Sequence, residues 1–384
     1  MSFRVSPNVS YPGVYVKEIS SDLHSIVGVP TTFTAFIGLS SKGPLNKATK
    51  ISSFSDFEKV FGGLSEYHNL GYTVNHFFLN GGNNAIIVSV GNDKTVISDK
   101  IISDKNRKSG IYCLDTMDDF NILCIPPYDE TETTAITVYQ KALEYCKLRR
   151  AILLVDPPKN WPDVKSVTRS MKNFFRDENA AIYFPRVKIK EKSDFVPCGI
   201  IAGIIARTDS SRGVWKAPAG TNAIMSGIED LMVHLSDDEI GVLNMDAVNC
   251  MKQFPAMGFV VWGSRTMKGT DVLASEWKYL AVRRTALFIE ESLYRGLKWT
   301  VFESNGASLW SSIRSNVDSF MNNLFRQGAF SAPSSDKAYF VKCGNTTTTQ
   351  NDIDKGIINV IVGFAPLKPA EFIIIKIQLF THVK

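Results

Sequence analysis

The sequence predicts a multi-domain α/β protein, in which a middle domain with a parallel sheet precedes a C-terminal α+β domain and each end forms an extended arm. Three observations support this fold class. Short apolar segments alternate with amphipathic ones between residues 121 and 207, which is typical of a parallel sheet with helices on both faces. Two long amphipathic segments follow between residues 276 and 327. Both ends of the chain carry strand-like segments bordered by prolines.

The first 20 residues are expected to form the N-terminal arm. Pro7 and the pair Pro12-Gly13 interrupt regular structure before the β-like segment V-Y-V. A polar stretch at residues 20–25 then separates this arm from the body of the protein. The side chains expected to make the contacts of this arm are Tyr11, Val14, Tyr15, Val16 and Ile19.

Residues 21–245 are expected to form the first large domain. Its opening part is predicted to contain strands at residues 31–39 and 85–90 and a helix at residues 72–79 that ends at a Gly-Gly pair. Ser55 and Glu58 have the spacing of a capping box at the start of a shorter helix. Residues 91–110 are charged and lack a stable period, so we expect an exposed excursion there.

The remainder of this domain shows a βαβ alternation. Apolar strands are predicted at residues 121–125, 151–155 and 180–184, and helices at residues 134–149, 163–176 and 198–207. A helix between two strands lets both strands run in the same direction, so the pattern predicts a parallel sheet.

The last third is expected to form a C-terminal domain at residues 246–364. Predicted helices cover residues 276–297 and 308–327, and predicted strands cover residues 259–262, 299–302, 339–342 and 357–364. Residues 365–384 form the second arm, set off by two prolines. Within it one strand face would be aliphatic, with Ile373, Ile375, Ile377 and Leu379, while Phe372 begins the mixed face. Such asymmetry suits a strand that joins the sheet of another subunit.

Composition argues against several functional classes. The net charge of +5 is spread along the chain without a run of Lys or Arg, so nucleic-acid binding has no support. No segment approaches the ~18 apolar residues that span a bilayer, and the first residues lack the apolar centre of a signal peptide. The six cysteines have no C-x-x-C spacing and are expected to be buried free thiols.

Catalytic, cofactor and metal sites are also not expected. The five histidines all lie outside residues 121–207, so a Ser-His-Asp triad has no base in the βαβ region. Asp156 ends a predicted strand, where parallel sheets place ligands, but Pro157 and Pro158 favour a rigid exit from the sheet. The glycine-rich stretches match neither the P-loop nor the dinucleotide fingerprint.

Several distinctive segments follow one another along nearly the whole chain. The earlier ones are Y-P-G-V-Y-V-K-E-I, V-P-T-T-F-T-A-F-I-G, F-F-L-N-G-G and W-K-A-P-A-G. The later ones are R-R-T-A-L-F-I-E-E-S-L-Y-R-G-L-K-W, L-F-R-Q-G-A-F, A-Y-F-V-K-C and V-G-F-A-P-L-K-P-A-E-F. In this order the segments closely resemble the contractile tail sheath family of phages, pyocin-type particles and extracellular injection systems. The resemblance implies a subtilisin-like topology for the middle α/β domain, without the catalytic residues.

The same resemblance implies a structural role rather than an enzymatic one. Subunits of this family form six-membered rings stacked helically around an inner tube, and their arms add strands to the sheets of neighbours. Contraction then drives the tube through a target envelope. Implied partners are further copies of the chain, the inner tube protein, baseplate and terminal cap proteins, and sheath paralogues in particles that encode several. Nucleic acid is not among these partners, and direct insertion into a membrane is not implied. Assembly is expected in the cytoplasm of the producing bacterium, followed by release in a virion-like particle.

Two helices offer candidate contacts with the tube. On the helix at 308–327, Arg314, Asp318 and Arg326 share a polar face. On the helix at 276–297, Arg283 and Arg284 are a second candidate, although the sequence alone favours a solvated face for the charges of this helix.

Two other functional classes stay open at this stage: a cryptic hydrolase on the α/β domain, and a host-binding surface protein that uses residues 92–108. The lack of long insertions suits pyocin-type particles and extracellular injection systems, but the sequence leaves open which system and which paralogue.

Overall fold

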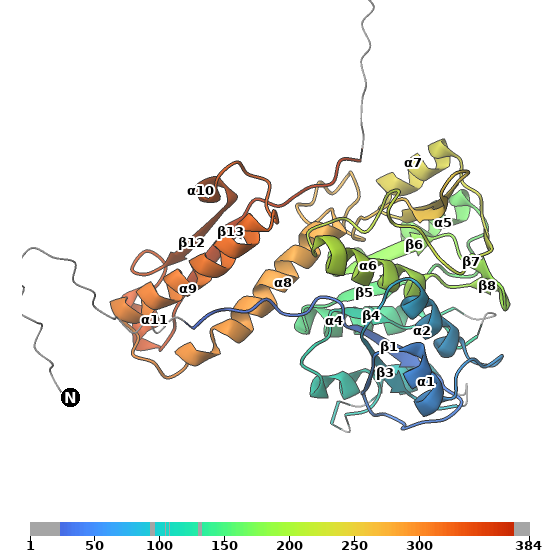
Figure 1. The fold of residues 1–384 in the computed structure, drawn as a ribbon, viewed down its shortest axis with the longest axis horizontal. Coiled ribbons are helices and arrows are strands. Elements are labelled where there is room, and N and C mark those ends of the chain that lie inside the picture. The colour runs from blue at the N-terminus through green and yellow to red at the C-terminus, as the bar shows by residue number, and fades with distance from the viewer. Residues whose placement is uncertain (1–23, 93–96, 104, 107, 130–132, 372–384) are drawn as a thin grey trace, which may run out of the picture.

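The computed structural model describes residues 24–92, 97–103, 105–106, 108–129 and 133–371. Within these residues the chain forms a large α/β body and a smaller C-terminal unit, and the long helix α8 (Leu280–Gly296) runs from one to the other (Figure 1). Most of the two predicted arms, including Tyr11 to Ile19 and Phe372 to Leu379, lies outside the described residues.

The α/β body is built on an eight-stranded sheet with the order β11-β10-β6-β5-β4-β1-β3-β2. Its parallel centre consists of β1 (Thr34–Gly38), β3 (Ala85–Ser89), β4 (Ile122–Cys124), β5 (Ile152–Val155) and β6 (Ala180–Phe184). Every residue of these strands is buried, as expected of a sheet covered on both faces. The predicted α/β class with a parallel-rich sheet is therefore confirmed, while the subtilisin-like topology stays a prediction.

The outer strands of the sheet differ from this centre. β2 (Thr49–Ile51) pairs antiparallel with β3 at one edge. At the other edge β10 (Asn249–Phe254) pairs parallel with β6, and β11 (Gly258–Val261) pairs antiparallel with β10. A separate three-stranded sheet contains β7 (Val187–Ile189), β8 (Lys192–Phe195) and β9 (Asp230–Leu231).

Helices cover both faces of the large sheet, and alternate residues of a strand therefore lie in two different cores. Ala35 and Ile37 of β1 join the core beneath α4 (Ile136–Leu148), α5 (Val164–Met171) and α7 (Asp237–Met245). Phe36 of the same strand joins the core beneath α1 (Phe54–Phe61), α2 (Asn69–Leu79) and α6 (Cys198–Arg212). Leu280 and Leu287 of α8 join this second core.

The C-terminal unit packs a long helix against a two-stranded sheet. The helix is α9 (Ala307–Arg326), and the sheet pairs β12 (Tyr339–Cys343) antiparallel with β13 (Val360–Phe364). The predicted apolar stripe of α9 is confirmed, since Leu309, Ile313, Val317, Phe320 and Leu324 are all buried in one core. Short segments complete the fold: α3 (Ile97–Ile102), η1 (Gly110–Thr116), η2 (Lys298–Thr300), α10 (Ser335–Ala338) and α11 (Gln350–Asp354).

The structure corrects the predicted domain boundary at residues 245 and 246. β10 and β11 follow that boundary, yet they extend the eight-stranded sheet and therefore belong to the α/β body. The predicted excursion at residues 91–110 is also only partly external, because α3 lies within it and Ile101 is buried in the core. The pairing of β10 with β6 and the burial of Ile101 both depend on residues far away in the chain, so the local pattern of the sequence did not reveal them.

Three local predictions are wrong in detail. The cap of α1 is Ser53, whose side chain accepts a hydrogen bond from the Asp56 amide, rather than Ser55. Helix α8 begins at Leu280 instead of residue 276, because Tyr279 forms a β-bridge with Arg265. Residues 299–302 form no strand: η2 ends at Thr300, and Phe302 has a φ of 72°, which a strand does not allow.

Candidate assembly surfaces

The described residues contain neither a metal-ligand cluster nor a candidate membrane-spanning helix. Among them no three His, Cys, Asp or Glu residues come together as a metal-binding group. Within the same part of the chain no helix is both long and apolar enough to cross a bilayer. All six cysteines are buried free thiols, which confirms their expected role as small apolar residues.

Asp156 is held inside the body rather than presented at its surface. The Cys198 amide donates to its Oδ1 at 3.0 Å, while its Oδ2 is buried without a hydrogen-bond partner. Burial raises the pKa of Asp156 to about 7, against the opposing effects of the hydrogen bonds from Cys198 and the charge of Arg186. The pair Pro157-Pro158 follows directly, as expected for a rigid exit from β5. Such a carboxyl group cannot reach a substrate.

The raised pKa predicts a pH-dependent cost in stability that Asp156→Asn should remove. In the unfolded chain the carboxyl titrates near ~3.9, so each pH unit from there up to its folded pKa costs up to about 1.4 kcal/mol. We expect the free energy of unfolding of the parent to fall, relative to Asp156→Asn, by about 2.5 kcal/mol between pH 5 and pH 8. Urea titrations at both pH values would measure this change. Parallel pH profiles for the two proteins would contradict the assignment.

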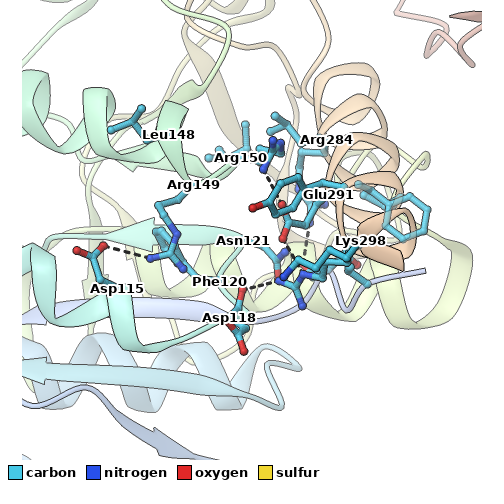
Figure 2. Close-up of a pocket in the computed structure, with 18 residues that line it drawn as sticks. Asp115, Asp118, Phe120, Asn121, Leu148, Arg149, Arg150, Arg284, Glu291 and Lys298 are labelled. Carbon is cyan, nitrogen blue, oxygen red and sulfur yellow. Dashed lines mark hydrogen bonds and ion pairs between the residues drawn. The ribbon is translucent and has the colours of Figure 1, made fainter. Parts of the chain in front are cut away.

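A charged cleft lies at the junction between α8 and the α/β body. Figure 2 shows its lining, which encloses about 630 Å³. Glu291 of α8 accepts from Arg150 at 2.9 Å and from Arg295 at 2.6 Å, and Arg295 also donates to Asp119 at 2.8 Å. The described residues that line the cleft include no His, Cys or Ser, so they offer no nucleophile–base pair of the serine or cysteine type. The network therefore holds α8 on the body.

Arg284, a candidate tube contact, is instead buried inside the subunit. Its guanidinium donates to both carboxylate oxygens of Asp209 in α6, at 2.7 and 2.6 Å, and to the Thr31 carbonyl at 3.1 Å. Its side chain is 3% exposed and that of Asp209 is 1% exposed. Arg284 lies four residues after Leu280 and three before Leu287, on the side of α8 that faces the second core. This corrects its assignment to a surface.

Arg283 is also engaged within the subunit. It donates to Asn179 Oδ1 at 3.0 Å and to Glu290 at 3.4 Å, and its guanidinium lies 4.9 Å from the centre of the Trp277 ring. Its side chain is only 14% exposed, so it offers little surface to a partner.

The other candidate face, on α9, is exposed as predicted. Arg314, Asp318 and Arg326 all lie outside the apolar stripe of that helix, and each is exposed. Arg314 donates to the Cys343 carbonyl at 3.0 Å, which connects this face to the neighbouring strand β12. No described residue pairs with the charge of Arg326. The α9 face therefore remains available for a partner.

The two-stranded sheet β12–β13 presents a second surface. Tyr339 and Val341 pack towards α9, whereas Phe340 is 49% exposed on the outer side and Ile361 is 48% exposed. Among the described residues neither strand has another strand beside it, so each keeps an outer edge of backbone groups. Small sheets of two strands gain stability when further strands are added. Sequence reasoning did not identify this sheet as an acceptor, although both of its strands were predicted.

Comparisons with known proteins agree on one family. Residues 111–267 match the family model for the phage tail sheath protein central domain, and residues 274–380 match the model for the phage tail sheath C-terminal domain. The tail sheath protein of Enterobacteria phage T4 is 26% identical over 268 residues, or 64% of this chain, and that of Vibrio phage KVP40 is 27% identical over 188 residues, or 48% of this chain. The chain covers only 39% and 27% of these two phage proteins.

Solved structures from extracellular particles match over almost the whole chain. A subunit of the PVC sheath complex, from an extracellular contractile injection system in the contracted state, is 27% identical with a TM-score of 0.79. The match covers 97% of this chain and 98% of that one. The helical sheath of the anti-feeding prophage in the contracted state is 28% identical with a TM-score of 0.79, covering 96% and 99%. These matches and the two consecutive domain models together show that the chain belongs to the contractile tail sheath family, whose members are structural proteins rather than enzymes.

Proposed function

We propose that this chain is the sheath subunit of a contractile particle, which polymerises as stacked six-membered rings around an inner tube and contracts to drive that tube outward. The observation that carries the proposal is the likeness, over nearly the full length of both chains, to sheath subunits of two extracellular systems. Both matched assemblies are in the contracted state, so contraction is a property of structural relatives of this chain.

The two arms join neighbouring subunits by strand addition. Residues 372–379 combine an aliphatic face with a mixed face, and the N-terminal arm carries the V-Y-V segment. An added strand forms backbone hydrogen bonds with a sheet edge and buries every second side chain. The joints between subunits can therefore persist while the bodies change their relative orientation.

The sheet β12–β13 is the acceptor for these strands. It has two outer edges among the described residues, and its outer face already carries the exposed apolar side chains of Phe340 and Ile361. Each edge can take one strand, so one subunit could receive two arms. A mesh of copies would follow from this repeated exchange.

The inner tube contacts the exposed face of α9, with Arg314, Asp318 and Arg326 as the candidate residues. Individual exposed ion pairs contribute only about 0–1 kcal/mol, but a helical lattice repeats each contact many times. Arg283 is largely engaged inside the subunit, and Arg284 is buried there, so neither is retained as a candidate.

Reversal of the α9 charges should weaken binding to the tube. We expect Arg314→Glu with Arg326→Glu to lower co-sedimentation with an inner tube protein severalfold, and to remove most of the salt dependence that the parent shows. The matched control is Lys165→Glu with Arg169→Glu on α5, which changes the net charge equally on another exposed helix. Equal losses in both double variants, or no loss in either, would contradict a specific contact on α9.

Other copies, a baseplate and a terminal cap are the remaining proposed partners, with sheath paralogues where a particle encodes several. Assembly would take place in the cytoplasm of the producing bacterium, before release of the particle. The structure favours neither alternative function: Asp156 is sealed in the core, and part of the segment suggested for host binding is packed through Ile101.

Electron microscopy of the chain co-expressed with an inner tube protein tests the proposed function. We expect tubes of regular helical symmetry with a six-fold repeat around the axis. Subunits that remain monomeric, or rings of another symmetry, would contradict it.

A further inference from the structure

A fully buried arginine lies where the α/β body meets the start of α8. Arg265 follows β11 and has a relative exposure of 0%. Its peptide is held by Asn249, whose Oδ1 accepts from the Arg265 amide at 2.6 Å and whose Nδ2 donates to the Arg265 carbonyl at 2.8 Å. Tyr279, the residue just before α8, forms a β-bridge with Arg265. These contacts fix the backbone of Arg265 independently of the contacts that its side chain makes.

The guanidinium of Arg265 forms a bidentate ion pair with the carboxylate of Glu371. Nε lies 2.8 Å from Oε1 of Glu371, and Nη2 lies 2.5 Å from Oε2. Nη1 donates to Asp271 at 3.1 Å and to the Asn244 carbonyl at 2.7 Å. Charge-assisted pairs of this geometry are strong and restrict direction as well as distance.

Two further side chains complete the site around Glu371. The Lys278 ammonium lies 2.6 Å from Asp271 and 3.8 Å from Glu371, and the Tyr279 hydroxyl lies 3.4 Å from Glu371. The two cations Arg265 and Lys278 thus balance the two carboxylates. Because the Arg265 side chain is inaccessible to solvent, salt should screen this pair much less than it screens the junction at Glu291.

Glu371 is the last described residue of the arm at residues 365–384, and the segment that leads to it crosses between the two parts of the fold. Ala365 is still tied to the C-terminal unit, since its amide donates to the Ala338 carbonyl at 2.8 Å and its carbonyl accepts from the Ser331 amide at 3.0 Å. From there the chain returns to the α/β body in an extended path that is visible in Figure 1. We call this segment, residues 366–371, the strap. Pro366 and Pro369 restrict its backbone.

We propose that Arg265 and Glu371 are positioning residues for strand donation: their pair clamps the root of the C-terminal arm to the α/β body, so that the donated strand starts beside the root of α8 and not beside β13. This inference rests on the proposed strand exchange. It explains why a buried cation faces a carboxylate 106 residues later, directly before a segment that otherwise has the composition of a strand.

The clamp also gives a route for force. A pull on the arm by a neighbouring subunit acts first on Glu371 and Arg265. The residues around Arg265 are bonded to the start of α8, because the Leu280 amide donates to the Ser264 carbonyl at 3.0 Å and the Thr266 amide donates to the Lys278 carbonyl at 3.0 Å. Since α8 connects the body to the C-terminal unit, the arm of one subunit would act on the helix that sets the relative orientation of these two parts.

Distances between spin labels in the unassembled subunit test the clamp itself. Labels would be placed at Ala370→Cys, next to the clamp, and at Lys165→Cys on the exposed side of α5, since all six native cysteines are buried. We expect a narrow distance distribution in the parent and a broadening of about twofold or more in Glu371→Gln, which keeps the size of the side chain but removes its charge. The matched control is Lys368→Ala, an exposed change within the same strap.

Assembly of the same variants, without labels, tests the positioning role. Glu371→Gln should still fold, with a lower urea midpoint because the buried Arg265 keeps only Asp271 as a carboxylate partner. It should yield fewer and less regular tubes than the parent or Lys368→Ala, while Glu371→Asp should restore part of the yield. An unchanged distance distribution in Glu371→Gln would overturn the clamp. A broadened distribution with normal tubes would overturn the positioning role. A parent that never polymerises would overturn the proposed function and the positioning role with it, while the label distances would still decide whether the clamp exists.

Discussion

Removal of residues 372–384 should leave a soluble, folded subunit that no longer forms tubes. The deletion keeps Glu371 and its pair with Arg265, so the body and the strap retain their described contacts. What it removes is the aliphatic strand face, in which each isoleucine buried against a neighbour would contribute about 1.5–3 kcal/mol. Electron microscopy and sedimentation would measure polymerisation, and circular dichroism would confirm the fold. Long regular tubes from the truncated chain would rule out donation of this strand.

A pair of substitution variants separates the two faces of the arm. Ile373, Ile375 and Ile377 replaced by Ser should reproduce the loss of tubes, because these side chains share the aliphatic face. Lys376 and Gln378 replaced by Ser alter only the mixed face and should leave assembly close to that of the parent. The reverse ranking would mean that the arm binds through its other face.

Arg284→Ala should cause the largest loss of stability among single substitutions in α8. The change leaves the Asp209 carboxylate, which is 1% exposed, without the guanidinium that now meets both of its oxygens. Breaking a buried pair on one side typically costs about 3–5 kcal/mol. Denaturant titration of the unassembled subunit would measure the loss. A change below about 1 kcal/mol would show that water reaches Asp209 and compensates it.

The double variant Arg284→Met with Asp209→Leu is the matched control for this prediction. Replacing both partners by apolar side chains removes the uncompensated charge, so the double variant should lie much closer to the parent than Arg284→Ala does. If the double variant were as unstable as the single one, the stabilising contact would be the bond from Arg284 to the Thr31 carbonyl or the local packing instead.

The buried Arg284–Asp209 pair and the partly exposed junction at Glu291 have different consequences for movement. The first ties the start of α8 to α6 inside the core, while the second joins the later turns of α8 to the body through partly exposed ion pairs. Exposed pairs are individually weak and are screened by salt. The start of α8 is therefore the firm attachment, which is also where the clamp at Arg265 meets the helix.

The sequence by itself was enough to predict the elements whose signal is local. The apolar runs of β4, β5 and β6 and the helices between them were identified because short buried strands and amphipathic helices carry different periods. The stripe of α9 follows from the three- and four-residue spacing of Leu309, Ile313, Val317, Phe320 and Leu324. The family motifs likewise are contiguous segments that can be recognised without a structure.

Only the tertiary structure decided which side chains are surfaces and which are internal pairs. Two adjacent arginines on α8 look alike in the sequence, yet the packing of the helix against α6 turns Arg284 towards Asp209, which lies 75 residues earlier. In the same way β10 joins β6, and Arg265 meets Glu371, across long separations in the chain. A helical or strand period depends on neighbouring residues alone, whereas the partner of a buried charge or of a strand edge depends on how the whole chain packs.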